Sequence, residues 1–323
     1  MTLLAAPTES IELRKAWGEQ LVTLADRYPN LVVLDGDLAN STRADIFAGA
    51  HPDRFLEMGI AEQNMLGVAA GLATIGFVPW ISTFAAFVTK RALDQIRMVI
   101  AQPSLNVKMC GAYSGILTSK TGKTHQSIED IAVFRAMPHV MTIVPADAVE
   151  LQAAMTAMME DDRPTYLRVT RDASPVIFDS DYRFTPRKAH LLRDGSDLGL
   201  ISTGIQTVRT LEAANLLEQQ GVSAAVLHVP TIKPLDRDAI CELAARTGAI
   251  VTAEDHSVIG GLGGAVAEVL SEEVPTRMRR VGIQDTYGES GPNDALLEKY
   301  GLTPAHVANT ASELLAIVAS SKG

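Results

Sequence analysis

Residues 58–90 read MGIAEQNMLGVAAGLATIGFVPWISTFAAFVTK, and this stretch decides the fold. Glu62 stands near its start, and no residue from Gln63 to Thr89 is charged. The glycines and Pro79 divide the stretch into an expected helix, strand and helix, at 60–74, 77–81 and 84–101. A carboxylate beside so apolar a segment is expected to be partly desolvated, and therefore protonated or tightly hydrogen-bonded. Glu62 is the first candidate for a functional residue.

Helical and strand patterns alternate on both sides of this stretch. In the first part of the chain we expect further helices at 10–27, 127–137 and 146–159, and further strands at 31–34, 107–110, 140–144 and 165–169. After a connection at 176–194, a second series has strands near 198–202, 224–229 and 249–253 and ends in a helix at 304–319. Such alternation predicts two doubly wound, mostly parallel α/β domains, at 1–175 and 195–323.

Composition excludes several classes of protein. The formal net charge of −10 disfavours non-specific binding to nucleic acid or anionic lipid. Cys110 and Cys241 are far apart in the sequence and match no metal-ligand spacing, so we expect both to be buried and unpaired. The N-terminus lacks the pattern of a signal peptide, and the uncharged run is too interrupted to be a membrane span, so we expect a cytoplasmic protein.

Ligands of open parallel sheets bind at the carboxyl ends of the strands. The expected strand ends nominate Asp37 and the segments 82–84, 111–125 and 168–171. In the second domain, residues 254–257 precede a glycine-rich turn at 260–264. The spacing of these glycines differs from a dinucleotide-binding motif, so close packing of a helix is the expected role of the turn.

The order and spacing of five segments resemble the C-terminal half of transketolase, as found in split, two-subunit transketolases. These segments are residues 58–65, 83–87, 124–126, 231–235 and 254–257. The resemblance covers nearly the whole chain. It implies a thiamine-diphosphate enzyme whose first domain here is the pyrimidine-binding domain.

The resemblance also implies roles around the cofactor ring. Glu62 matches the glutamate that hydrogen-bonds the pyrimidine nitrogen and so activates the cofactor. Phe84 and Phe87 match aromatic residues that flank this ring, although their helical spacing alone would favour core packing. Asp37 matches an aspartate that contacts the cofactor. Lys90 stands where many relatives place another aromatic residue of the ring pocket.

Four residues match family positions that contact the sugar substrate: Arg14, Ser41, His125 and Arg171. Arginines can hold a substrate phosphate through forked, charge-assisted hydrogen bonds. His125 is suited to hydrogen-bond the oxygens of the donor and to shuttle a proton, so we count it with Glu62 as catalytic. Arg168 either assists Arg171 or forms a surface ion pair.

Two departures from the family affect the expected substrate. Residues 119–126 read SKTGKTHQ, whereas relatives acting on ordinary pentose and hexose phosphates carry GEDGPTHQ. Thr121 replaces an aspartate that recognises a substrate hydroxyl, and Tyr113-Ser114 replaces a pair that begins with a phosphate-supporting histidine. The added lysines make the loop more positive. We therefore expect a non-standard ketose, such as a branched sugar phosphate or a sulfonated sugar.

Family members bind the diphosphate through Mg²⁺, which a Gly-Asp-Gly segment and an asparagine hold. Gly36-Asp37-Leu38 lacks the second glycine, so we expect no metal site in this chain. A partner, the N-terminal-section transketolase subunit, would then hold diphosphate and metal, in a heterotetramer with two copies of each subunit. The alternatives are the β subunit of a 2-oxoacid dehydrogenase decarboxylase component, a deoxyxylulose-phosphate-synthase-like enzyme, and a non-catalytic subunit.

Overall fold

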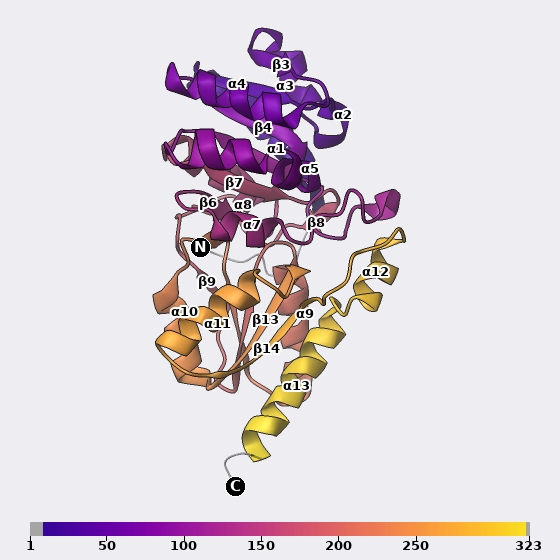
Figure 1. Ribbon diagram of the computed structural model, residues 1–323. Helices are drawn as coiled ribbons and strands as arrows, with labels where there is room; N and C mark the ends of the chain where they lie inside the picture. The colour runs from indigo at the N-terminus through magenta and orange to yellow at the C-terminus, as the bar shows by residue number, and fades with distance from the viewer. Residues whose placement is uncertain (1–8, 321–323) are drawn as a thin grey trace.

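The computed structural model describes residues 9–320, which form two α/β domains stacked end to end (Figure 1). The first domain is built on a seven-stranded sheet with the order β12-β6-β7-β5-β4-β2-β3. All of its neighbouring strands are parallel except the β12–β6 pair. Its strands are β2 (Leu31–Asp35), β3 (Phe55–Glu57), β4 (Val78–Phe84), β5 (Lys108–Ala112), β6 (Met141–Ile143), β7 (Thr165–Val169) and β12 (Thr231–Lys233).

Helices cover both faces of this sheet because its strands are apolar on both sides. One face carries α1 (Leu13–Arg27) and α8 (Ala148–Met159), whose buried residues include Trp17 and Met155. The other carries α4 (Glu62–Thr74) and α7 (Asp130–Ala136), whose buried residues include Met65 and Phe134. The short helices α2 (Ala39–Thr42) and α3 (Asp45–Ala50) connect β2 to β3, and β1 (Ser10–Glu12) pairs with β8 (Ala173–Pro175).

The second domain has a five-stranded sheet with the order β14-β13-β10-β11-β9, in which only the β9–β11 pair is antiparallel. Its strands are β9 (His190–Arg193), β10 (Leu198–Ser202), β11 (Ala224–His228), β13 (Ala249–Ser257) and β14 (Arg277–Ile283). Its helices are α9 (Gln206–Gln219), α10 (Arg237–Thr247), α11 (Leu262–Glu272), α12 (Asn293–Lys299) and α13 (Pro304–Ser320). The expectation of two mostly parallel α/β domains is confirmed.

Three local expectations are corrected by the structure. The helix expected at 84–101 is divided into α5 (Ala85–Arg91), α6 (Leu93–Gln95) and a π-helix (Ile96–Ala101), and Phe84 is the last residue of β4. The expected helix at 10–27 begins with strand β1. The connection expected at 176–194 contains β9, and β12, from the second half of the chain, covers the β6 edge of the first sheet. Periodicity cannot reveal which sheet edge a short strand will cover.

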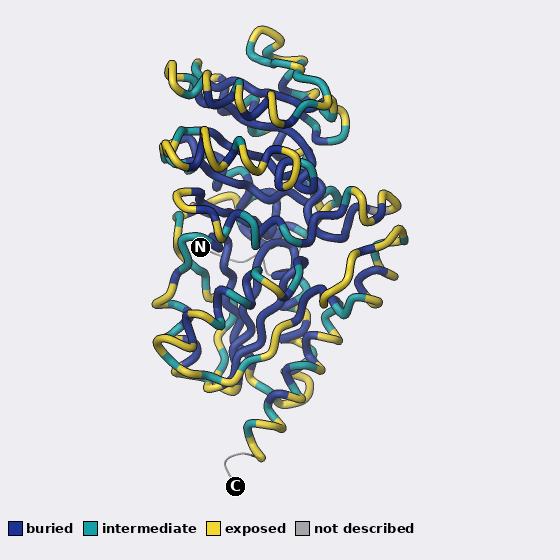
Figure 2. Tube along the Cα trace, in the orientation of Figure 1, coloured by how far each residue is buried: buried dark blue, intermediate teal, exposed yellow. Residues whose placement is uncertain are grey.

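Figure 2 shows that the central strands of both sheets are buried, while exposed positions follow the outer sides of the helices and occur on the edge strands β3, β9 and β14. Cys110 is buried as expected, but Cys241 on the outer helix α10 is only half-buried. Within residues 9–320, no helix combines the length and apolarity that crossing a membrane requires.

Candidate active site

Glu62 is the first residue of α4, and its side chain is only 3% exposed. A buried carboxylate needs a partner, because an isolated charge is costly to remove from water. Arg91, the last residue of α5, supplies it: Nη1 donates to Glu62 Oε1 at 2.6 Å. The expectation that Glu62 is desolvated and tightly hydrogen-bonded is confirmed, but the sequence reasoning missed Arg91. Its position four residues after Phe87 on one helix is the signal that could have found it.

An aromatic cluster adjoins Arg91, the partner of Glu62. The Phe84 and Phe87 centroids are 5.5 Å apart, and the His125 ring meets both nearly edge-on, at 5.7 and 5.4 Å. Tyr113 stacks on Phe84, with the two ring centroids 4.0 Å apart. The Arg91 guanidinium carbon lies 3.9 Å from the Phe87 centroid. The cluster therefore joins β4, α5 and the loop after β5 into one apolar wall.

Tyr113 also organises two of the arginines nominated by the sequence. Its hydroxyl accepts hydrogen bonds from Arg14 Nη1 and from Arg171 Nε, both at 3.2 Å. Arg14 also donates to the backbone oxygen of Ser41 at 3.0 Å. Tyr113 is buried and has a positive φ of 57°, a backbone conformation that is uncommon for a bulky residue and is concentrated at functional sites. The structure thus brings Arg14, Ser41 and Arg171 together around a residue to which the sequence reasoning gave no direct role.

Asp37 lies at the carboxyl end of β2. It is exposed and has a φ of 63°, and its backbone N–H donates to Glu57 Oε1 at 3.0 Å. Asp35, two residues earlier, is buried, and this burial raises its pKa to about 6. Asp35 Oδ1 accepts from the Leu38 N–H at 2.6 Å, which holds the turn that carries Ser41.

Lys90 and Thr121 bond to groups other than Glu62 and the aromatic rings. The Lys90 ammonium lies 2.8 Å from Glu129 Oε1, so the cation that contacts Glu62 and Phe87 is the next residue along the chain. The Thr121 hydroxyl donates to the oxygens of Thr118 within its own turn. In the described part of the chain, no three His, Cys, Asp or Glu side chains are arranged to hold a metal.

Arg168 forms a buried ion pair, which corrects the expectation of a surface pair or a substrate contact. Its side chain is 3% exposed, and Nε donates to Asp130 Oδ2 at 2.8 Å. Burial disfavours the charged form of Asp130, but the charges of Arg168 and His256 and the hydrogen bonds from Arg168 and Tyr166 together outweigh this effect and lower the pKa of Asp130. Arg168 Nη2 donates to the backbone oxygens of Ser127 and Asp255, so this residue joins the two domains.

Each of the two domains matches the model of a known protein family. The model of the transketolase pyrimidine-binding domain matches residues 9–176, and the model of the transketolase C-terminal domain matches residues 187–307. These matches define the class: an α/β protein built from the pyrimidine-binding and C-terminal domains of transketolases. The chain belongs to the transketolase family and corresponds to the C-terminal section of split transketolases. Transketolases depend on thiamine diphosphate.

Several relatives are similar over almost their full length. The 6-deoxy-6-sulfo-D-fructose transketolase subunit of Clostridium sp. strain MSTE9 is 41% identical, with 94% of each chain covered. One of the subunits of the apulose-4-phosphate transketolase of Phocaeicola vulgatus is 35% identical, with 94% of this chain and 98% of that one covered. A solved structure described as a split-gene transketolase, inactive β4 tetramer, is 47% identical with a TM-score of 0.89, and covers 95% of this chain and 99% of that one.

Proposed function

We propose that this protein is one subunit of a transketolase that transfers a two-carbon ketol unit from a ketose to an aldose. The observation that carries the proposal is the buried carboxylate of Glu62, which Arg91 connects to the cluster of the Phe84, Phe87 and His125 rings. When bound, thiamine diphosphate supplies the nucleophilic carbon that accepts the ketol unit. The chain must then hold the pyrimidine ring, keep water away from it and place the sugar.

The residues beside Glu62 fit a flat, nitrogen-containing ring. The planar guanidinium of Arg91 lies against Phe87 while it donates a hydrogen bond to Glu62. A pyrimidine ring with a protonated nitrogen can make the same two contacts: the ring stacks on Phe87, and the nitrogen donates to the Glu62 carboxylate. We infer that Arg91 leaves Glu62 when the cofactor ring enters, since both would occupy the space over Phe87.

Each remaining residue has a role that its chemistry supports. Glu62 holds or shares a proton with the pyrimidine nitrogen, and its burial keeps water from competing. His125 adjoins both phenylalanines and can move a proton at the sugar oxygens. Arg14 and Arg171, joined through the Tyr113 hydroxyl, bind the anionic end of the sugar, with Ser41 beside them. Asp37 and Lys90 are proposed as outer contacts of the cofactor, and Thr121 as a substrate contact.

We propose that the N-terminal section of the enzyme, as a partner chain, binds the diphosphate and Mg²⁺, and that two copies of each chain form a heterotetramer. The relative described as inactive when it is a β4 tetramer supports a need for a different partner. Titration calorimetry of this chain alone with thiamine diphosphate and Mg²⁺ is expected to give little or no binding heat. Tight Mg²⁺-dependent binding without a partner would contradict this proposal.

We further propose that the donor is a non-standard ketose, either branched or sulfonated. Tyr113 stands between the two arginines where a histidine is common in the family, and the exposed Lys120 and Lys123 adjoin Thr121 on the loop. These differences change both the shape and the charge around the acidic group of the sugar. The names of two relatives, which specify a sulfonated hexose and apulose 4-phosphate, support the same interpretation.

A ketose panel tests this choice of donor. The reconstituted enzyme is assayed with 6-deoxy-6-sulfo-D-fructose, apulose 4-phosphate and xylulose 5-phosphate, each with a panel of aldose acceptors. We expect kcat/KM for one of the first two donors to exceed that for xylulose 5-phosphate by about 10-fold or more, the range that pocket contacts provide. The proposal fails if xylulose 5-phosphate with ribose 5-phosphate is turned over as efficiently as any other pair.

A further inference from the structure

We propose that the C-terminal domain positions the active-site loop, residues 113–128, through Asp255 and Gln126. The inference rests on the proposed function, because it gives that loop a part in holding the substrate. The loop connects β5 to α7 and carries Tyr113 at its start and His125 near its end. Both side chains lie against Phe84, so a shift of the loop moves both of them relative to the cofactor site.

Asp255, from β13 of the second domain, holds the first part of the loop. Its side chain is buried, and Oδ1 accepts a hydrogen bond from the Ile116 N–H at 3.1 Å. The loop backbone approaches the carboxylate closely, since a Cβ at Gly115 would lie 1.9 Å from Oδ2. Gly115 has a φ of 78°, a conformation that also favours glycine. The contact between Asp255 and the loop therefore depends on the backbone conformation at Gly115.

Gln126 holds the last part of the loop. Its amide nitrogen donates to the backbone oxygens of Ile116 and of Glu289, both at 3.0 Å. The first of these bonds ties the two ends of the loop together, and the second ties them to the segment after β14. A Cβ at Gly288 would lie 2.0 Å from Gln126 Oε1, so this segment also passes close to the loop. The side chain of Gln126, the residue after His125, thus connects the loop to the second domain.

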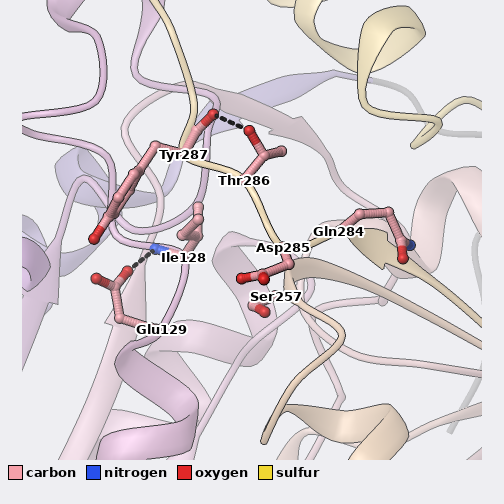
Figure 3. A pocket seen from close by; sticks show the side chains of 7 residues that line it. All are labelled: Ile128, Glu129, Ser257, Gln284, Asp285, Thr286 and Tyr287. Atoms are coloured by element: carbon pink, nitrogen blue, oxygen red, sulfur yellow. Dashed lines mark hydrogen bonds between the residues drawn. The ribbon is translucent and has the colours of Figure 1, made fainter.

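Backbone contacts complete the attachment. The Ser257 N–H donates to the Ile128 oxygen at 2.7 Å, and the buried Arg168 side chain bridges the oxygens of Ser127 and Asp255. Beside these bonds, residues 284–287 line a cleft of about 280 Å³ together with Ile128 and Glu129 (Figure 3). Because close packing is interrupted at the cleft, the hydrogen bonds of Asp255 and Gln126 contribute to the position of the loop, together with the packing of Ile116 and Leu117 in the core.

Four variants of the full chain test this proposal. Gln126→Met and Asp255→Ala remove the two attachments. Asp255→Asn keeps an oxygen acceptor for the Ile116 N–H, and it is a close replacement because burial raises the pKa of Asp255. Arg135→Met is the matched control, since Arg135 donates from α7 to Gly260 and Glu268 of the second domain and neither of these partners belongs to the loop.

Hydrogen exchange of the chain alone measures the attachment without any reaction. We expect amides of residues 113–128 to exchange about 10-fold faster in Gln126→Met and Asp255→Ala than in the wild type, Asp255→Asn or Arg135→Met, because local opening becomes easier. If Asp255→Ala fails to fold, Gln126→Met decides. Unchanged protection of the loop in Gln126→Met, or equal protection in Asp255→Ala and Asp255→Asn, would overturn the proposal.

The reconstituted enzyme measures the consequence for the substrate. Gln126→Met is expected to lower kcat/KM by about 10- to 100-fold, mainly through KM, because small displacements of positioning groups are costly. The dissociation constant of thiamine diphosphate is expected to stay near the wild-type value, since Glu62, Phe84 and Phe87 lie outside the loop. A kcat/KM unchanged in Gln126→Met would also overturn the proposal. Absence of ketol transfer in the wild-type complex would refute the proposed function, while the exchange result would still decide whether the loop is held.

Discussion

Replacing Glu62 by glutamine is expected to lower the turnover of the assembled enzyme by about 10²- to 10⁴-fold, the range typical of a lost proton-transfer group. Glutamine has nearly the same shape, and its amide oxygen can still accept the hydrogen bond from Arg91. The fold and the assembly should therefore survive, while the side chain can no longer hold or share a proton. Steady-state kinetics of the reconstituted enzyme measure kcat, and light scattering verifies the assembly.

Two further variants make this result specific. Glu273→Gln alters an exposed glutamate of the second domain and should leave turnover unchanged. Arg91→Met removes the side chain that occupies the space over Phe87, so the assembled enzyme should bind thiamine diphosphate at least as tightly as the wild type. Near-normal turnover of Glu62→Gln would remove Glu62 from the mechanism. Weaker cofactor binding in Arg91→Met would show that Arg91 supports the ring instead of giving way to it.

Replacing Arg171 by methionine is expected to lower kcat/KM for an anionic ketose by about 10- to 100-fold, because a hydrogen bond to a charged group contributes roughly 1.5–3 kcal/mol. Tyr113 engages Nε of Arg171 at 3.2 Å and Asp172 Oδ1 engages Nη1 at 3.4 Å, while 29% of the side chain is exposed, so Nη2 can face a ligand. The loss should fall mainly on KM, since the anionic end of the sugar does not react. Initial-rate kinetics over a range of donor concentrations separate the two constants.

A neutral donor supplies the comparison for Arg171. The comparison is an uncharged ketose. Its kcat/KM should fall less than about 3-fold when only an anion contact is lost. Arg183→Met, at an exposed arginine of the connection between the domains, is the matched control. Equal losses for neutral and anionic donors would assign Arg171 a structural role, and no loss for either would exclude it from the substrate site.

The sequence alone determined the architecture and the most important residue. Strands β7 and β10 have the bounds expected from the sequence, because a strand buried on both faces is mostly apolar, although β7 also contains the buried Arg168. The burial of Glu62 also followed from its uncharged neighbours, since an apolar helix α4 must pack against the face of the sheet that contains β4. Local patterns of this kind report which segments are buried, and they need no knowledge of which segments meet.

The tertiary structure alone decided which groups meet at the site. The partner of Glu62 lies 29 residues away, and the two arginines on the Tyr113 hydroxyl lie 99 and 58 residues from it. The attachment of the loop to Asp255 spans 139 residues and crosses from one domain to the other. Such contacts depend on the order of strands in a sheet and on the docking of two domains. Periodicity carries neither, because a strand shows the same apolar pattern whichever neighbour it pairs with.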